Sequence, residues 1–237
     1  MENISLKRDY VAIYNEDNRT TSFGGNQSWF SGNPWHNVSH QGCGLISAVD
    51  AALYISNQTH ISHFAYTNLI SDFIHFFPSS KIFMHEFFRA HLSVGILPRQ
   101  ICSYIKKATN NEVRARWNGI HGHKHFIEKV TKQLDQDLPV VWGLYSMGKE
   151  LTLYTLYEAT GQYKAATTVN SHYVNAVGVT FSPEYRKYTD QIRKNDIMIE
   201  VSSWGRKYYV DYREYLDFIG DSLIAKYASN IVILTRN

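Results

Sequence analysis

The chain has 237 residues, with 24 Lys and Arg against 21 Asp and Glu, and a formal net charge of +3. This small charge excludes a nucleic-acid-binding protein that depends on a strongly basic surface. With 44% hydrophobic and 14% aromatic residues, the composition is that of a globular protein rather than a disordered chain. The length favours a single domain over 1–237.

Cysteine usage and hydropathy narrow the class of protein further. Cys43 and Cys102 are the only cysteines, which excludes a disulfide scaffold and a zinc site of four cysteines. No apolar run reaches the roughly 18 residues of a membrane span, and the first residues lack the apolar core of a secretory signal. We therefore expect a reducing, cytoplasmic compartment and no membrane partner.

The first half of the chain is predicted to be mainly helical. Residues 22–44 are rich in Gly, Asn, Ser, Pro and Trp and predict a long functional loop. Directly after it, apolar residues recur at three- and four-residue spacing, which indicates a buried helix over about 43–56. Further helices are predicted over 61–77, 82–92, 98 to about 108, and 123–136.

The second half is predicted to be rich in strands. Strands are expected over 139–145, 150–158, 162–169, 173–181, 197–202, 207–212 and 231–235. The two segments on either side of Gly161 are expected to pair as a hairpin. A helical half followed by a strand-rich half predicts an α+β fold with two lobes rather than alternating βαβ units.

Cys43 stands where the predicted loop becomes the predicted helix. The positive end of a helix dipole and free backbone N–H groups favour the thiolate at such a position. Gly42 and Gly44 are expected to let a substrate backbone approach, and the N–H of Cys43 to serve as an oxyanion donor. The alternative is that Cys43 is a small buried residue that opens a core helix.

His172 begins the apolar run His-Tyr-Val-Asn-Ala-Val-Gly-Val at the head of a predicted strand. Polar residues precede it, so its ring is expected to face a cleft; the alternative is a histidine of the core. It follows Cys43 by about 130 residues, a separation typical of papain-type Cys–His pairs. Cys43 and His172 are therefore candidates for a nucleophile and its base.

Three strings in this order resemble the papain-like cysteine proteases. They are the run that begins at His172, a strand that ends in Ser-Trp-Gly at 203–205, and a Tyr-containing strand after it. Cys43 and the glycine after it at a helix start, preceded by Gly-Gly-Asn-Gln-Ser-Trp-Phe at 24–30, are most similar to the bacterial peptidase C39-like branch. The resemblance spans about 24–215.

The resemblance implies one papain-like catalytic domain of two lobes. The lobe over about 24–137 would be mainly helical and the lobe over about 138–237 mainly β. It also implies a cysteine peptidase that cuts a peptide or protein substrate through a thioester, with His172 holding Cys43 as a thiolate. No cofactor and no metal are required by this chemistry.

Several positions depart from the family pattern. The family's Asn that orients the histidine immediately precedes Ser-Trp-Gly, and Ser202 stands there in this chain. If Ser202 only ends a strand, the Ser203 hydroxyl or a backbone carbonyl takes the imidazole N–H instead. Trp204 is expected to shield the bond between Ser202 and His172 from water. An alternative alignment puts Ile46 at the nucleophile position and makes the protein inactive.

The family's oxyanion glutamine has no unambiguous match. Gln27, Asn37 and Gln41 are the candidates. Gln27 comes first, because it lies in the Trp-flanked block at 24–30, and Gln41 comes second.

The other histidines and the second cysteine are weaker candidates for a functional site. His121, His123 and His125 alternate in a Gly-containing loop, where three imidazoles could bind zinc. Because no fourth ligand is evident, we expect a solvated loop and no metal. Cys102 is expected to be a core residue on the apolar face of a short helix.

The leading hypothesis is thus a thiol peptidase with Cys43, His172 and Ser202 as its catalytic group. A catalytically silent papain-like binding module is the first alternative, because of the departure at Ser202 and the unplaced glutamine. A deamidase or transglutaminase-like acyl transferase is the second, since it uses the same Cys–His chemistry.

Overall fold

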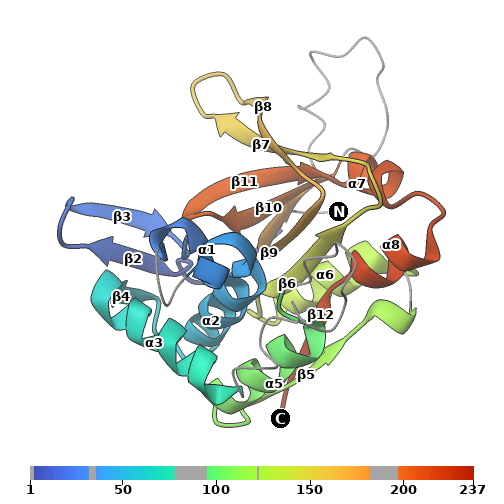
Figure 1. Ribbon diagram of the computed structural model, residues 1–237. Helices are drawn as coiled ribbons and strands as arrows, with labels where there is room; N and C mark the ends of the chain where they lie inside the picture. The colour runs from blue at the N-terminus through green and yellow to red at the C-terminus, as the bar shows by residue number, and fades with distance from the viewer. Residues whose placement is uncertain (1–2, 32–35, 78–94, 122, 182–196) are drawn as a thin grey trace.

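The computed structural model describes residues 3–31, 36–77, 95–121, 123–181 and 197–237 (Figure 1). The helix expected over 82–92 lies outside these ranges. Figure 1 shows helix α2 in the middle of the molecule, with a large sheet beside it and the β7–β8 hairpin projecting from that sheet.

The large sheet has seven strands in the order β1-β9-β10-β11-β7-β8, and β6 also pairs with β9. Its strands are β1 (Ile4–Ser5), β6 (Val140–Tyr145), β7 (Leu151–Tyr157), β8 (Gln162–Val169), β9 (Ser171–Thr180), β10 (Met198–Ser203) and β11 (Arg206–Asp211). Every pair in it is antiparallel, as expected where hairpins rather than crossover helices join neighbouring strands.

Two smaller sheets flank it. One holds β2 (Ala12–Asn15), β3 (Thr20–Phe23) and β4 (His60–Ser62), and the other holds β5 (Val113–Trp117) and β12 (Val232–Arg236). The last strand of the chain thereby returns to the middle of the sequence.

Helix α2 (Cys43–Ile55) is largely apolar, and twelve of its residues are buried. A helix of this kind is stable only when it is surrounded by other elements. It packs against α3 (His63–Phe76), α5 (Pro98–Ala108) and strand β9, which separates two hydrophobic clusters. Val177 of β9 packs in the first cluster with α2, and Val174 and Ala176 pack in the second.

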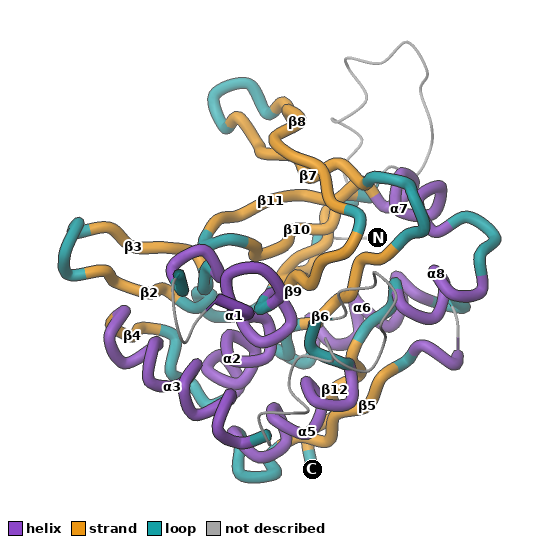
Figure 2. Tube along the Cα trace, viewed as in Figure 1, coloured by secondary structure: helices purple, strands orange, loops and turns teal. Residues whose placement is uncertain are grey.

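The second cluster involves α6 (Phe126–Asp135), α7 (Tyr212–Ile219) and α8 (Leu223–Ala228). Two 3-10 helices, η1 (Gln27–Trp29) and η2 (Gly119–His121), and the short helix α1 (His36–Gln41) complete the described elements. Figure 2 shows α1, α2, α3 and α5 gathered on one side of the large sheet, whereas α6 and α8 lie towards the right of the picture.

The structure is mixed α and β, compatible with the predicted α+β class, and most of the elements predicted within the described ranges are confirmed. As predicted, helices make up most of the described structure before residue 138 and strands most of it after that residue. The first half also contributes β1 to β5, and the second contributes α7 and α8. The expected long loop over 22–44 contains η1 and α1, and α1 leads through Gly42 directly into α2. The structure thus holds Cys43 between two helices rather than at the end of a loop.

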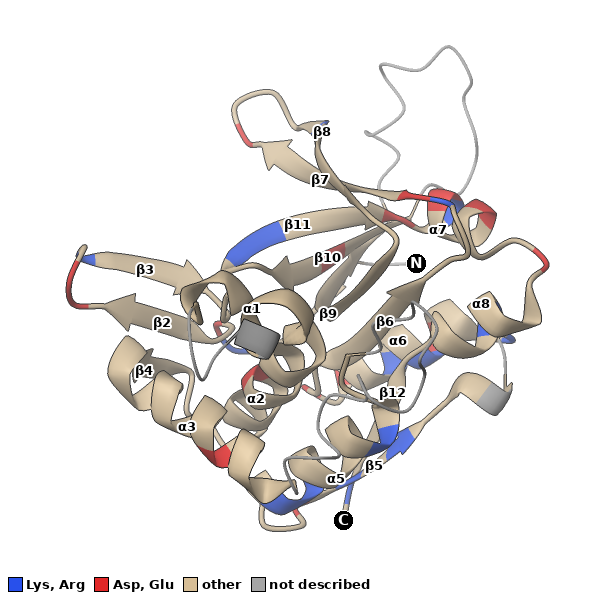
Figure 3. Ribbon diagram, viewed as in Figure 1, with Lys and Arg blue, Asp and Glu red and all other residues tan. Residues whose placement is uncertain are grey.

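Charged residues lie mostly at the periphery. Figure 3 shows basic segments on α5, β5 and β12, and acidic residues on α7. Asp50 is the only charged residue of α2. Among the residues described, no helix has both the length and the apolar character needed to cross a membrane.

Candidate active site

Four segments that are distant in sequence meet around one small pocket. The segment that enters η1 contributes Gly25 and Gln27, and α2 contributes Cys43, Ser47 and Asp50. Strand β9 contributes its second residue, His172, and the end of β10 contributes the residues 202–204. The pocket encloses about 10 Å³, close to the least volume that holds one water molecule.

Cys43 is the first residue of α2, after Gly42 as the N-cap. From the sequence we expected the glycines on either side to leave room for a substrate backbone. The structure does not show such room. A Cβ on Gly42 would collide with the carbonyl of Val38, and a Cβ on Gly44 would lie 3.0 Å from the ring of Tyr173. These glycines therefore allow α1 and β9 to approach the start of α2.

The surroundings of the Cys43 sulfur favour the thiol. Burial raises its pKa above the ordinary value, while the backbone N–H groups of Tyr173, Gly44 and Cys43 itself act in the opposite direction. The expected helix-terminus effect is thus present but is outweighed by desolvation. The hydrogen bond from the Tyr173 N–H also places the sulfur beside the peptide unit that follows His172.

His172 is buried, with 7% of its surface exposed, and it makes two contacts that fix its ring. Its Nε2 lies 2.7 Å from the Ser203 Oγ. Trp204 stacks on the ring, with 4.3 Å between the ring centroids and an interplanar angle of 24°. Burial lowers the pKa of His172 to about 3, so the imidazole is neutral at neutral pH.

The hydrogen bond that the sequence assigned to Ser202 is made by Ser203. The Ser202 hydroxyl instead donates to the carbonyl of Phe23, at 2.8 Å. Successive side chains of a strand point to opposite faces, so one serine of β10 faces His172 and the other faces the segment before η1. Trp204 contacts His172, but the Ser202–His172 bond that it was predicted to shield is not made, because Ser203 bonds to the imidazole instead.

A tight turn brings Trp204 onto His172. Trp204 and Gly205 join β10 to β11 and have φ values of 48° and 73°. A two-residue hairpin with both central residues in the left-handed region is a type I′ turn, which suits the twist of the strands. A bulky residue such as Trp has a strained backbone in this region. Its stacking on His172 is a contact that favours this conformation.

Of the three oxyanion candidates, the structure brings Gln27 to the pocket. Its Nε2 donates to the carbonyl of Ser39 at 2.9 Å, and its buried Oε1 accepts no hydrogen bond from the described residues. Gln41 ends α1 and its backbone faces Gly95 instead. The side chain of Asn37 lies outside what the structure describes.

Asp50 lines the pocket, although it was not among the site residues predicted from the sequence. It follows Cys43 and Ser47 at the spacing i, i+4, i+7, which puts all three on one face of α2. Its carboxylate accepts hydrogen bonds from the Gly25 N–H at 2.9 Å and from the Tyr66 hydroxyl at 2.7 Å. Burial raises its pKa to about 7, against the effect of these two donors. A single acid in an apolar helix was the signal available.

The histidines near 121–125 do not form a common site. His123 is half-buried, with its Nε2 2.8 Å from the Tyr215 hydroxyl and 2.6 Å from the Ser229 carbonyl, so the expectation of a solvated loop is wrong for it. His125 pairs with Glu128 on α6. In the described ranges, no three His, Cys, Asp or Glu side chains are grouped as metal ligands.

Cys102 lies on α5 and packs, partly buried, against the first cluster, as predicted. Burial raises the pKa of its thiol to about 12, so it is a weak nucleophile at neutral pH.

No protein-family model matches this chain, and no curated protein matches it in sequence.

Proposed function

We propose that the protein is a papain-like cysteine peptidase, with Cys43 as nucleophile and His172 as its base. The observation that carries this proposal is that Cys43 and His172 line one pocket while the Nε2 of His172 is engaged by Ser203. When Nε2 carries the ring proton and donates it to Ser203, the Nδ1 is left as the basic atom. A papain-like two-lobed arrangement, with the pocket between the α2 side and the β side, is part of the same proposal.

The pKa directions define how the pair works. Because burial raises the pKa of Cys43 and lowers that of His172, both are neutral before reaction. The imidazole of His172 then removes the thiol proton as the sulfur attacks the scissile carbonyl. The imidazolium gives this proton to the leaving amine, and the acyl group stays on Cys43 as a thioester. Water hydrolyses the thioester with His172 again as base, which restores the thiol.

The negative charge that develops on the carbonyl oxygen needs donors within the pocket. Gln27 is our candidate, because it lines the pocket and, among the described residues, its side-chain amide donates one hydrogen bond, to the Ser39 carbonyl, which leaves its second N–H for the substrate. The N–H groups of the first turn of α2 have no carbonyl partner within that helix and are the second source. A reducing, cytoplasmic compartment suits a free nucleophilic thiol, and the free state of both cysteines is consistent with it.

A catalytically silent binding module is the second candidate, and one observation favours it. The Cys43 thiol has a raised pKa and is only partly exposed, and it faces a pocket with room for about one water molecule, so the resting site is too narrow for a peptide. An enzyme must open this pocket for a substrate, whereas a silent module need not.

Cleavage of a peptide library separates the two candidates. We expect wild-type protein and a Cys102→Ala variant to give the same products, because Cys102 lies away from the pocket. Cys43→Ala and His172→Ala should abolish or strongly reduce cleavage while their thermal unfolding stays cooperative. Ammonia release or amine incorporation with glutamine peptides, in place of cleavage, would instead show an acyl transferase.

A further inference from the structure

Asp50 is almost fully buried, with 2% of its surface exposed, and the catalytic scheme does not use it. Its two carboxylate oxygens are held by donors from two other segments, Gly25 before η1 and Tyr66 of α3. These donors, rather than a basic side chain, act against the rise that burial causes in its pKa. Burying such a carboxylate costs free energy of folding, so we expect a functional reason for its place in the pocket.

The segment that Asp50 holds is fixed on its other side by the turn that carries Trp204. The Gly205 N–H donates to the carbonyl of Gly25 at 2.9 Å, and the Phe23 N–H donates to the carbonyl of Gly205 at 2.8 Å. The Ser202 hydroxyl donates to the Phe23 carbonyl. The segment 23–25 is therefore clamped between the helix that begins with Cys43 and the strand that ends beside His172.

The clamp leaves no room for adjustment. A Cβ on Gly24 would lie 2.6 Å from the Asp50 Oδ2 and would collide with the Ser202 hydroxyl. A Cβ on Gly25 would collide with the Tyr66 hydroxyl. Gly24 also has a φ of 77°, in the region that favours glycine. Both glycines are thus needed for the chain to pass this close to Asp50.

Tyr66 extends the clamp to the residues after Gln27. Its ring meets the indole of Trp29 edge-on, at 6.1 Å between centroids, and the indole also contacts His63 at 4.9 Å. Gln27 therefore lies between two fixed points, the Gly25–Asp50 hydrogen bond and the packing of Trp29 on α3.

We propose that Asp50 is a positioning residue that holds the segment 23–27 against α2, so that the Gln27 amide faces the carbonyl oxygen of a substrate bound at Cys43. This inference rests on the proposed function, because it assigns the amide of Gln27 to the oxyanion. Asp50 acts through Gly25 and does not touch the reacting atoms.

The test compares two reactions of Cys43 that differ in their need for an oxyanion donor. Alkylation by iodoacetamide needs only the nucleophile, whereas a peptidyl aldehyde adds to the thiol and forms a tetrahedral oxygen that the donors bind. Aldehyde affinity is read from its protection of Cys43 against iodoacetamide, which requires no known substrate. Amide hydrogen exchange over 23–27 is measured in the same proteins.

For Asp50→Ala we expect the alkylation rate to stay within about twofold of wild type and the aldehyde affinity to fall by about tenfold to a hundredfold. Amide exchange over 23–27 should accelerate while the amides of α2 stay protected. Asp50→Asn retains a carbonyl acceptor for the Gly25 N–H and should restore most of the affinity. Tyr54→Phe, at the far end of the same helix, is the control for general destabilisation and should change neither reaction.

An Asp50→Ala protein that binds the aldehyde as wild type does would overturn the proposal. So would an Asp50→Asn protein with the full loss, or unchanged exchange over 23–27. If wild-type protein itself shows no aldehyde protection, the proposed peptidase function fails, and the exchange measurement still decides whether Asp50 holds the segment.

Discussion

The Nε2 of His172 and the Oγ of Ser203 are joined by a hydrogen bond of 2.7 Å, and both residues are buried. This bond fixes which ring nitrogen remains basic. It also means that the serine directly before Trp204, and not Ser202, takes the place of a histidine-orienting residue.

The first prediction separates these two serines. Ser203→Ala removes the partner of the His172 Nε2, and we expect kcat to fall about tenfold, the scale of one neutral hydrogen bond. Ser202→Ala is the comparison, because it removes a hydroxyl one residue away that bonds to the Phe23 carbonyl instead, so any loss in that variant reports the segment 23–25 and not the imidazole. Kinetics of cleavage of one library peptide measure both. A loss in Ser202→Ala with Ser203→Ala unchanged would show that the hydrogen bond at Ser203 has no role in turnover.

The second prediction concerns the pH dependence of Cys43 alkylation. Burial raises the pKa of the thiol and lowers the pKa of His172 to about 3, so the pair is neutral over the ordinary range. The iodoacetamide rate in a Cys102→Ala background should therefore rise continuously from about pH 5 to about pH 9, because only the thiolate reacts. A plateau that begins at acidic pH would instead demonstrate a preformed thiolate–imidazolium pair.

The third prediction is a pH dependence of stability that originates at Asp50. Its pKa is raised by burial from 3.8 to about 7, so the folded protein binds this proton more tightly than the unfolded chain does. The favourable contribution is complete below about pH 4 and is lost as the pH rises through about 7. The facing hydroxyls of Tyr10 and Tyr66 have raised pKa values and stay neutral over this range, as does His172 in the same pocket.

Asp50→Asn removes the titration but keeps an acceptor for the Gly25 N–H. Urea unfolding of wild type and variant should thus show a stability difference that shifts in favour of the variant between about pH 5 and about pH 8. A constant difference across this range would mean that Asp50 is not the titrating group.

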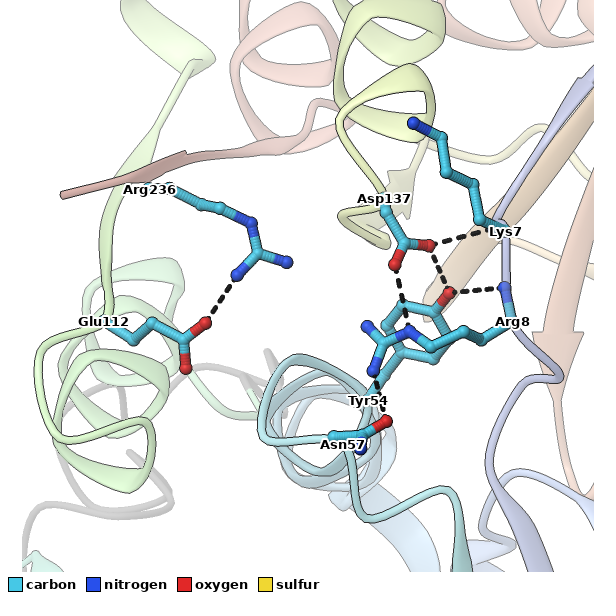
Figure 4. A network of polar contacts seen from close by, with 7 residues as sticks. All are labelled: Lys7, Arg8, Tyr54, Asn57, Glu112, Asp137 and Arg236. Atoms are coloured by element: carbon cyan, nitrogen blue, oxygen red, sulfur yellow. Dashed lines mark hydrogen bonds and ion pairs between the residues drawn. The ribbon is translucent and has the colours of Figure 1, made fainter.

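The fourth prediction concerns the network that ties the N-terminal segment to α2. Figure 4 shows Asp137 accepting hydrogen bonds from the Lys7 N–H, the Arg8 Nε and the Tyr54 hydroxyl. The same figure shows the exposed ion pair of Glu112 with Arg236. Both sites are carboxylates that bind an arginine, but Asp137 has more donors and is more buried than Glu112. Comparing the two therefore measures the effect of the additional donors and of burial.

Asp137→Asn should lower the free energy of unfolding by about 1.5–3 kcal/mol at neutral pH, because hydrogen bonds to a charged group are lost. Glu112→Gln should cost less than about 1 kcal/mol, as exposed ion pairs do. The donors lower the pKa of Asp137 below its ordinary value, so its contribution is present above about pH 4 and disappears as the pH falls through the lowered value. Equal losses in the two variants would contradict this assignment.

Local patterns account for the parts of the fold that could be predicted. The three- and four-residue spacing of apolar residues identified α2, and Gly161 marked the turn of the β7–β8 hairpin. Strands β2 and β3 were missed because they are short and their exposed residues give no periodic pattern. Strand β5 was missed because its stability comes from pairing with β12, more than a hundred residues away.

In the candidate site, too, local patterns were predictable and contacts between distant segments were not. The order of Cys43, His172 and Trp204 along the chain was readable, because each stands at the start or end of an apolar run. Which of two adjacent serines faces His172 depends on the face of β10 that is turned to the site, and a sequence alone does not specify it. Asp50 was missed because its partners come from two distant segments.

The proposed function requires that Cys43 is a nucleophile that His172 assists. The most direct measurement is the site and rate of covalent labelling by a peptidyl epoxysuccinate, with Cys102 in the same molecule as the internal control. We expect a single adduct on Cys43 in wild-type protein and labelling slower by about a hundredfold in His172→Ala. An adduct on Cys102 instead of Cys43, or the same labelling rate in wild type and His172→Ala, would contradict it.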